Sequence, residues 1–344
     1  MSIVVPKLAD ITKIKYFYRF KYLINPDKIT KIFHKLDIPS TYGDCSKLKV
    51  LEMYPGPALQ STIFYNEFKP KQHFLMESRP SFVKFNSNRY TDPESGFSLV
   101  HKNPYNWESY TDLIEKEKVL IPSIQSRDHI NTEFLVMANL TEKGHEGLVM
   151  QWVNCMGHQN WLMKYGLVKM LLWVPATTAL KLLSRPGAKA HSRCSIMMET
   201  FSNTKLVAIS DGAELKLFDP DLIEKWDPII CDDKKDMHPV NNNSVALIEI
   251  NPRDRDIDYD NWDYITRQLM ILKKTPLIDS LESLGHGARN YFVDAINDPA
   301  FLKKSPIDLT PCEFEYIMEL FVNWPFKPDI YMEQFDINQD ETRT

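Results

Sequence analysis

The chain has 344 residues, of which 43% are hydrophobic and 25% are charged, and its formal net charge is −5. These values are near the averages of folded globular proteins, and the length is sufficient for one large domain and a smaller one. The longest apolar run, Met170 to Leu180, contains Pro175 and is shorter than the roughly eighteen residues that cross a bilayer. The composition therefore excludes a membrane-spanning helix, and the net charge alone does not indicate nucleic-acid binding.

Five cysteines are scattered along the chain without the C-x-x-C pairs that hold zinc, and they suggest no disulfide framework. They are Cys45, Cys155, Cys194, Cys231 and Cys312. We expect free thiols in a reducing compartment and no metal site.

The N-terminal segment is basic, with Asp10 as its one acidic residue. It is compatible with mitochondrial import or with an ordinary solvated helix, but it lacks the Ser- and Arg-rich composition of a cleavable presequence. Its basic residues are Lys7, Lys13, Lys15, Arg19 and Lys21.

Asn25 and Pro26 predict the start of a helix, because asparagine caps helices and proline fits the first helical position. Apolar residues then recur at helical spacing. They are Ile29, Ile32, Phe33 and Leu36.

Seven short apolar runs, several rich in β-branched residues, alternate with helical or polar segments. They are Leu48–Met53, Phe74–Met76, Phe97–Val100, Phe134–Ala138, Met170–Val174, Lys205–Ile209 and Val245–Ile250. This alternation predicts a largely parallel sheet with helices on both faces, which is an α/β, Rossmann-like fold.

From about Asp258 the pattern changes to helices alone, and T-P-C-E at Thr310 to Glu313 forms a capping box with proline at the first helical position. We expect an α/β domain over residues 1–257, a smaller all-helical domain over 258–328 and an acidic flexible tail over 329–344. The helical domain has two apolar stripes. They are Trp262, Ile265, Leu269 and Leu272, and Phe314, Ile317, Met318 and Phe321.

Residues 50–61 read V-L-E-M-Y-P-G-P-A-L-Q-S, the shape of a loop that binds S-adenosylmethionine after a buried strand. Such loops favour glycine because the backbone must approach the ligand. Gly56 is present, whereas Tyr54 and Ala58 occupy the other two glycine positions. Glu77 follows a second apolar run at the separation expected of an acid that binds ribose hydroxyls. A Pro-Gly turn after a strand is also a common plain turn.

Further segments follow in the order of the rRNA adenine dimethyltransferase family, which the chain resembles over nearly its whole length. K-Y-L-I-N-P resembles the opening motif, whose leucine, here Leu23, covers the cofactor. V-H-K-N resembles the segment that binds adenine, with Asn103 where aspartate is usual. R-P-G-A-K at 185–189 and residues 267–277 also match. The resemblance implies a class I S-adenosylmethionine methyltransferase fold with a helical C-terminal domain.

The family motif Asn-Leu-Pro-Tyr falls at Asn139, Leu140, Thr141 and Glu142. In an adenine N6 methyltransferase the asparagine accepts a hydrogen bond from the target amino group, and the aromatic ring stacks on the flipped base. Losing that ring removes about 1–3 kcal/mol of base binding. With the cofactor positions above, four sites depart from the catalytic pattern. We therefore expect no catalytic residues and a degenerate cofactor pocket at Leu23, Gly56, Glu77, Asn103 and Asn139.

Charge is unevenly distributed, because residues 157–198 hold six basic residues and no acidic one, whereas 254–263 and 329–341 are acidic. Basic residues among aromatic ones suit single-stranded DNA, so this stretch is a candidate nucleic-acid surface. An ordinary solvated surface is the alternative. The candidate residues are Lys164, Lys169, Lys181, Arg185, Lys189 and Arg193.

W-P-F-K-P-D, L-L-W-V-P-A-T-T-A and N-W-D-Y-I-T-R-Q-L-M-I-L-K are similar to fungal members of the family that serve the mitochondrial RNA polymerase as specificity factors. This resemblance implies a monomeric initiation factor in the mitochondrial matrix that needs no cofactor. Its expected partners are the core polymerase, the melted nontemplate strand of promoter DNA and, near the tail, the template strand. An active mitochondrial rRNA adenine N6-dimethyltransferase and a plain protein-interaction scaffold are the alternatives.

Overall fold

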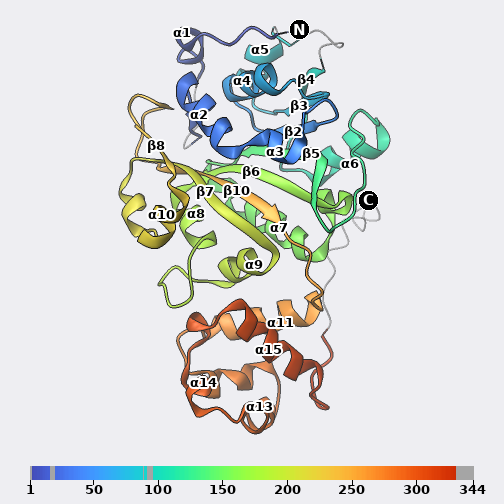
Figure 1. Ribbon diagram of the computed structural model, residues 1–344, viewed down its shortest axis with the longest axis vertical. Coiled ribbons are helices and arrows are strands. Elements are labelled where there is room, and N and C mark those ends of the chain that lie inside the picture. The colour runs from blue at the N-terminus through green and yellow to red at the C-terminus, as the bar shows by residue number, and fades with distance from the viewer. Residues whose placement is uncertain (1, 16–19, 88, 91–95, 331–344) are drawn as a thin grey trace. The chain divides into compact units, whose positions relative to one another are not determined.

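The computed structural model describes residues 2–15, 20–87, 89–90 and 96–330 (Figure 1). Arg19 and nearly all of the expected acidic tail therefore lie outside the described residues. The chain forms two compact units, as far as it is described. Unit 1 comprises residues 1–183 and 201–254, and unit 2 comprises 184–200 and 255–344. The expected boundary near 257 did not anticipate that 184–200 belongs with the helical C-terminal part.

Unit 1 is built on an eight-stranded sheet of order β4-β3-β2-β5-β6-β10-β7-β8. β10 is antiparallel to both β6 and β7, and all other neighbours are parallel. The strands are β2 (Lys49–Met53), β3 (Gln72–Met76), β4 (Phe97–Val100), β5 (Ile130–Asn139), β6 (Leu167–Pro175), β7 (Ser202–Ser210), β8 (Ile229–Cys231) and β10 (Val245–Pro252). The seven predicted strands are confirmed. β8 was missed because it is only three residues long.

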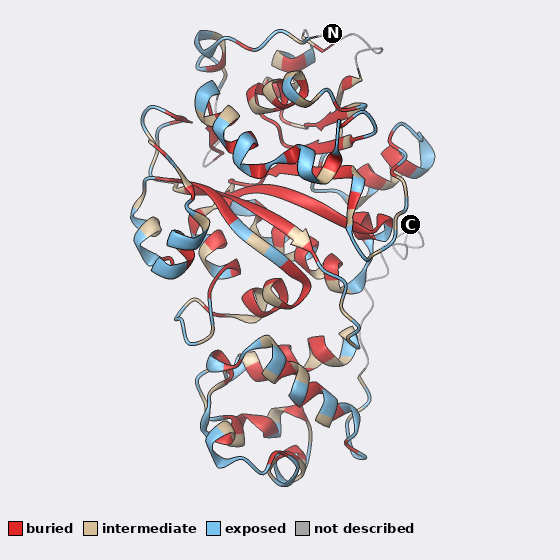
Figure 2. Ribbon diagram, in the orientation of Figure 1, coloured by how far each residue is buried: buried red, intermediate tan, exposed pale blue. Residues whose placement is uncertain are grey.

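The central strands are buried on both faces, which explains why they are almost continuously apolar rather than alternating (Figure 2). Figure 1 shows α2 and α4 on one side of the sheet and α7 and α8 on the other. The helices of unit 1 are α1 (Leu8–Ile11), α2 (Pro26–Leu36), α3 (Ile38–Tyr42), α4 (Leu59–Phe68), α5 (Pro80–Ser87), α6 (Trp107–Thr111), α7 (Glu146–His158), α8 (Ala176–Leu182) and α10 (Pro220–Trp226).

The helix predicted after Asn25 is α2, and its start is fixed as the sequence indicated. The Asn25 side chain accepts hydrogen bonds from the backbone N–H groups of Asp27 and Lys28. The apolar stripe faces the core, where Phe33 packs edge-on against Phe64 of α4 with 5.2 Å between ring centroids. Just before α2, β1 (Tyr22–Leu23) pairs with β9 (Met237–His238) in a separate two-stranded ribbon.

Unit 2 is helical, as predicted for the C-terminal part. Thr310 and Glu313 form the expected capping box at the start of α15. Leu272 was expected in the apolar stripe of α11 but is 39% exposed, because α11 ends at Ile271. Its helices are α9 (Arg193–Phe201), α11 (Tyr259–Ile271), α12 (Leu277–Ser280), α13 (Ala288–Ile296), α14 (Pro299–Lys303) and α15 (Pro311–Val322). The last residue of α9, Phe201, belongs to unit 1.

Residues 184–191 belong to unit 2 because three hydrogen bonds hold them there. The Gly187 N–H donates to the Ile307 carbonyl oxygen (2.8 Å), and Lys273 Nζ donates to the carbonyl oxygens of His191 (2.9 Å) and Lys189 (3.4 Å). None of the described helices combines the length and the apolar character of a membrane span.

Candidate functional site

The loop after β2 keeps the backbone shape of a glycine-rich turn although two of its glycine positions hold other residues. Tyr54, Gly56 and Ala58 all have left-handed backbones, with φ of 53°, 60° and 55°. For a residue with a side chain this conformation costs about 1–2 kcal/mol, because its Cβ approaches the following carbonyl oxygen. The loop lies at the carboxyl end of β2 beside parallel strands, the place where α/β sheets bind ligands.

The space in front of this loop is filled by Phe20. A Cβ added to Gly56 would lie 3.0 Å from Cε1 of Phe20, whose side chain is fully buried. The missing side chain of Gly56 therefore lets an aromatic ring of the same chain approach the backbone. No sequence motif singled out Phe20.

Glu77 lies directly after β3, as predicted, and it is fully buried. Its Oε1 accepts hydrogen bonds from the backbone N–H groups of Ser78 (3.0 Å) and Arg79 (2.9 Å). Its Oε2 accepts one from Gly56 (3.3 Å). Burial raises the pKa of Glu77, and the Arg79 guanidinium 3.7 Å away opposes that change. The oxygens that the resemblance assigns to a ribose thus hold the loop and Arg79.

We use the name Arg79 plug for five packed side chains: Phe20, Tyr54, Arg79, Glu142 and His145. The Arg79 guanidinium lies 3.7 Å from the ring centroid of Phe20 and 4.5 Å from that of Tyr54, which are cation–π distances. Its Nη2 donates to Glu142 Oε2 at 3.2 Å. The His145 ring stacks on Tyr54 with 4.4 Å between centroids.

The plug is electrostatically consistent with a closed interior. Burial, with a smaller contribution from the positive charge of Arg79, lowers the pKa of His145 to about 4, so its ring is neutral at neutral pH. Burial also raises the pKa of the Tyr54 hydroxyl. That hydroxyl donates to Asn103 Oδ1 (3.1 Å), which also accepts from the Tyr105 N–H (3.1 Å). The amide oxygen expected to face adenine is therefore bonded within the chain.

Asn139 lies at the end of β5, where the target-base motif was predicted, and its side chain is also bonded internally. Its Nδ2 donates to the Lys21 carbonyl oxygen (2.9 Å). Its Oδ1 accepts from the backbone N–H (3.2 Å) and the hydroxyl (2.8 Å) of Thr141. Thr141 Oγ1 in turn accepts from the Lys21 N–H (2.9 Å). The amide thus joins the opening segment to the end of β5.

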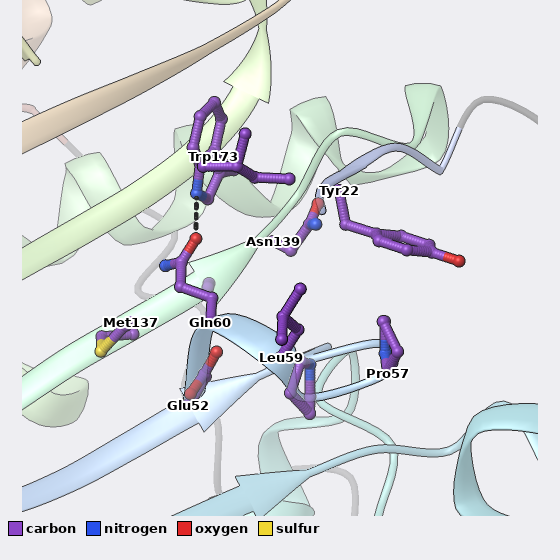
Figure 3. Close-up of a pocket in the computed structure, with 11 residues that line it drawn as sticks. Tyr22, Glu52, Pro57, Leu59, Gln60, Met137, Asn139 and Trp173 are labelled. Atoms are coloured by element: carbon purple, nitrogen blue, oxygen red, sulfur yellow. Dashed lines mark hydrogen bonds between the residues drawn. The ribbon is translucent and has the colours of Figure 1, made fainter. Parts of the chain in front are cut away.

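Leu23 and Asn139 line a small cavity at this edge of the sheet (Figure 3). Its volume is about 20 Å³, which is room for about one water molecule, whereas small-molecule sites measure about 300–1,000 Å³. Trp173 Nε1 donates to Gln60 Oε1 (2.9 Å) across this cavity, as the dashed line in Figure 3 shows. The five predicted cofactor residues are therefore gathered at one edge, but the residues present do not fit S-adenosylmethionine.

The predicted basic surface is neutralised at most of its positions by acidic residues from elsewhere in the chain. Because these partners all lie outside residues 157–198, the absence of acids within that stretch did not reveal them. Among the described residues, Lys189 forms no ion pair. The pairs are Lys164–Glu115 (2.6 Å), Lys181–Glu146 (2.5 Å), Arg185–Glu199 (2.7 Å) and Arg193–Asp263.

Lys169 is wrong as a nucleic-acid contact. It lies in β6 with only 4% exposure, and its Nζ bonds to Glu249 of β10 (2.9 Å) and to Thr41 (3.1 Å). A lysine in a strand buried on both faces needs such a partner, because an unpaired charge there would be strongly unfavourable. Tyr165 and Trp173 are buried as well, so these two rings are core residues.

The family described as Ribosomal RNA adenine dimethylase matches residues 11–319, which span both units. This chain belongs to that family. The membership explains why the family's loop, acid and asparagine positions meet at one edge of the sheet.

Within the family, the chain is similar to proteins named Mitochondrial transcription factor 1. It is 51% identical to that of Saccharomyces paradoxus and 50% identical to that of Saccharomyces cerevisiae, each over 341 residues and 99% of both chains. The protein of that name from Lachancea kluyveri is 50% identical over 340 residues. The resemblance to fungal mitochondrial transcription factors is confirmed.

The fold is that of a class I methyltransferase, as predicted. A dimethyladenosine transferase from Plasmodium falciparum superposes with a TM-score of 0.58, covering 88% of this chain and 96% of that chain. The two sequences are only 13% identical, so this likeness concerns the fold alone.

Proposed function

We propose that this protein is a noncatalytic initiation factor of mitochondrial transcription that uses a degenerate methyltransferase fold. The observation that carries the proposal is the 50–51% identity, over 99% of both chains, to proteins named Mitochondrial transcription factor 1. We place the protein in the mitochondrial matrix, acting as a monomer.

The crevice in front of the loop after β2, which side chains of the same chain fill, supports the noncatalytic part of the proposal. Phe20 occupies the approach to the Gly56 backbone, and Glu77 is bonded to the chain's own N–H groups. The amide oxygen of Asn139 accepts a hydrogen bond from the Thr141 hydroxyl. Neither a cofactor nor a flipped adenine finds the free polar groups that it requires, because those groups hold the Arg79 plug and the opening segment together.

The partners we propose are the core mitochondrial RNA polymerase and promoter DNA. The factor would confer promoter recognition and melting, hold the melted nontemplate strand and bring residues 329–344 near the template strand. Lys164, Lys181, Arg185 and Lys189 are exposed and remain candidates for DNA contact, because exposed ion pairs contribute only about 0–1 kcal/mol and open readily. Arg193 is a weaker candidate, since its partner Asp263 is buried.

Run-off transcription with the core polymerase on a duplex promoter tests this proposal. We expect specific transcripts only when the factor is present, and equal output without it would contradict an initiation role. A plain scaffold would bind the polymerase without changing promoter use.

Calorimetric titration with S-adenosylmethionine tests the noncatalytic part separately. We expect no tight binding, because the crevice lacks volume and free hydrogen-bonding groups. A micromolar constant together with methyl transfer to rRNA adenines at enzyme-like rates would instead establish the dimethyltransferase alternative.

A further inference from the structure

The basic N-terminal segment is held firmly on unit 1 and is part of its fold. The Ile3 N–H donates to Asn66 Oδ1, and Asn66 Nδ2 donates back to the Ile3 carbonyl oxygen, each at 2.7 Å. Ile11 is fully buried. Lys7, Lys13 and Lys15 of this segment therefore extend from a backbone that is fixed on the surface, whereas Lys21 is buried.

Residues 10–15 run along α5, and Figure 1 shows α1 and α5 at the same end of unit 1. Beyond the end of α5, Arg89 Nη2 pairs with Asp10 (3.6 Å). Near its start, the Ser81 hydroxyl donates to the Lys15 carbonyl oxygen (3.4 Å). These two contacts set the direction of the segment and place Lys13 alongside the helix.

Four cations consequently share one surface, which we name the basic strip: Lys13, Lys15, Lys84 and Arg89. The three lysines are exposed, and within the described part of the chain none of them forms an ion pair. Only Arg89 has a carboxylate partner, the 44%-exposed Asp10. The strip differs in this respect from the candidates between 164 and 193, most of which are neutralised by acids of the chain itself.

We propose that the basic strip binds the phosphodiester backbone of a nucleic acid. Exposed, unpaired lysines on a fixed surface attract a polyanion and release its condensed counterions, which is the main source of sequence-independent affinity. The Arg89 guanidinium lies 4.4 Å from the ring centroid of Phe85, so the strip also holds a preorganised planar cation of the kind that binds phosphate in a bidentate manner.

The position of the strip favours a nucleic acid over another polyanion. α5 follows Glu77 and Arg79 at the carboxyl edge of the sheet, where the family positions of the cofactor and the target base meet. A strand bound along α5 would therefore pass the Arg79 plug. This inference rests on the proposed function or on its dimethyltransferase alternative, since both act on nucleic acid.

The experiment compares the whole protein with two charge-matched triple variants, using fluorescence anisotropy with single-stranded DNA, duplex DNA and single-stranded RNA over a series of salt concentrations. The strip variant carries Lys13→Gln, Lys15→Gln and Lys84→Gln. The control carries Lys31→Gln, Lys35→Gln and Lys71→Gln, which are exposed lysines elsewhere on unit 1 that form no ion pair in the described structure. Urea unfolding checks that neither variant loses stability.

For the strip variant, we expect the slope of log affinity against log salt to become shallower by about two units on single strands, from roughly 0.7 unit per lost phosphate contact. The control should keep the parental slope. The preferred probe identifies the strand type. An unchanged slope in the strip variant, the same loss in the control, or a parent that binds no probe at low salt would overturn the proposal. The proposal would also be overturned if the strip variant lost binding to anionic-lipid vesicles but kept the parental binding to all three nucleic-acid probes.

Discussion

The hydroxyl of Thr141 lies 2.8 Å from the amide oxygen of Asn139, within the motif that should present that oxygen to a target base. The next residue, Glu142, is bonded to Arg79 at 3.2 Å. Both replacements of the family's Pro-Tyr pair therefore make contacts inside the chain. The residues that departed from the catalytic pattern now stabilise the closed crevice.

Arg79 should be a major stabilising residue of unit 1. Its side chain is 8% exposed and lies between two aromatic rings and two carboxylates, one of which, Glu77, is fully buried. Arg79→Met leaves the buried Glu77 carboxylate without the cation that lies 3.7 Å from it, so we expect the free energy of unfolding to fall by about 3 kcal/mol or more. Urea unfolding followed by circular dichroism measures this change.

Glu142→Gln is the matched control, because the Glu142 side chain is 36% exposed and its pairing with Arg79 is solvated. We expect a loss of less than about 1 kcal/mol. Similar losses in both variants would show that the stabilisation lies in the exposed pair rather than in the buried centre of the plug.

Apolar runs and capping motifs predicted much of the fold, because the burial or helix start that each one indicates depends on residues that are close together in the sequence. The apolar runs at Phe97–Val100 and Val245–Ile250 and the capping box at Thr310 are of this kind. The position of Glu77 at a strand end was predictable for the same reason. What occupies its oxygens was not, because that depends on side chains brought together by the tertiary fold.

Pairs distant in sequence account for the errors at the site. Phe20 and Gly56 are in contact although 36 positions separate them in the chain. Lys169 is 80 residues from Glu249, so a count of charges around Lys169 could not identify its partner. A lysine inside the run L-V-K-M-L-L-W-V-P was the available signal, since a strand buried on both faces admits a charge only when it is paired.

Replacing Lys169 should affect stability and leave nucleic-acid binding unchanged. Lys169→Met leaves Glu249 buried without its cation, which should cost about 3–5 kcal/mol in the free energy of unfolding. The double variant Lys169→Met, Glu249→Leu should recover most of that loss, because apolar residues of similar volume can replace a buried ion pair. Urea unfolding of the two single variants and the double variant gives the coupling energy.

DNA-binding titrations of the same double variant complete this test. Its affinity and salt dependence should match those of the parent protein, since the Lys169 ammonium group does not reach the surface. A shallower salt slope in a variant that is fully folded would return Lys169 to the nucleic-acid surface.

His145 should make the protein less stable at acidic pH. Its pKa is about 4 in the folded chain against an ordinary value of 6.5, so the unfolded state binds the proton more readily between these values. The contribution to stability is complete above pH 6.5 and is lost as the pH falls towards 4, with an upper limit of about 3 kcal/mol. Burial lowers the pKa of His191 and His238 as well, which adds to the same trend.

His145→Phe isolates this contribution, because phenylalanine keeps the stack on Tyr54 and does not titrate. The free energy of unfolding, measured from pH 4 to pH 6.5, should rise less steeply with pH than in the parent protein. Parallel curves for the two proteins would mean that His145 has similar proton affinities in the folded and unfolded states.

Deletion of residues 329–344 should separate folding from function. The segment follows Trp324, which packs on Tyr291 at 5.9 Å between ring centroids, so it leaves unit 2 from a fixed position. Only five of its 16 residues are apolar, and five are acidic, so it offers little area to bury and the free energy of unfolding should stay within about 0.5 kcal/mol of the parent. Under the proposed function, truncation should reduce initiation on a duplex promoter more than on a pre-melted one. Holding the template strand matters most where the strands must first be separated. Equal activity of the truncated and full-length factors on both templates would show that the segment takes no part in initiation.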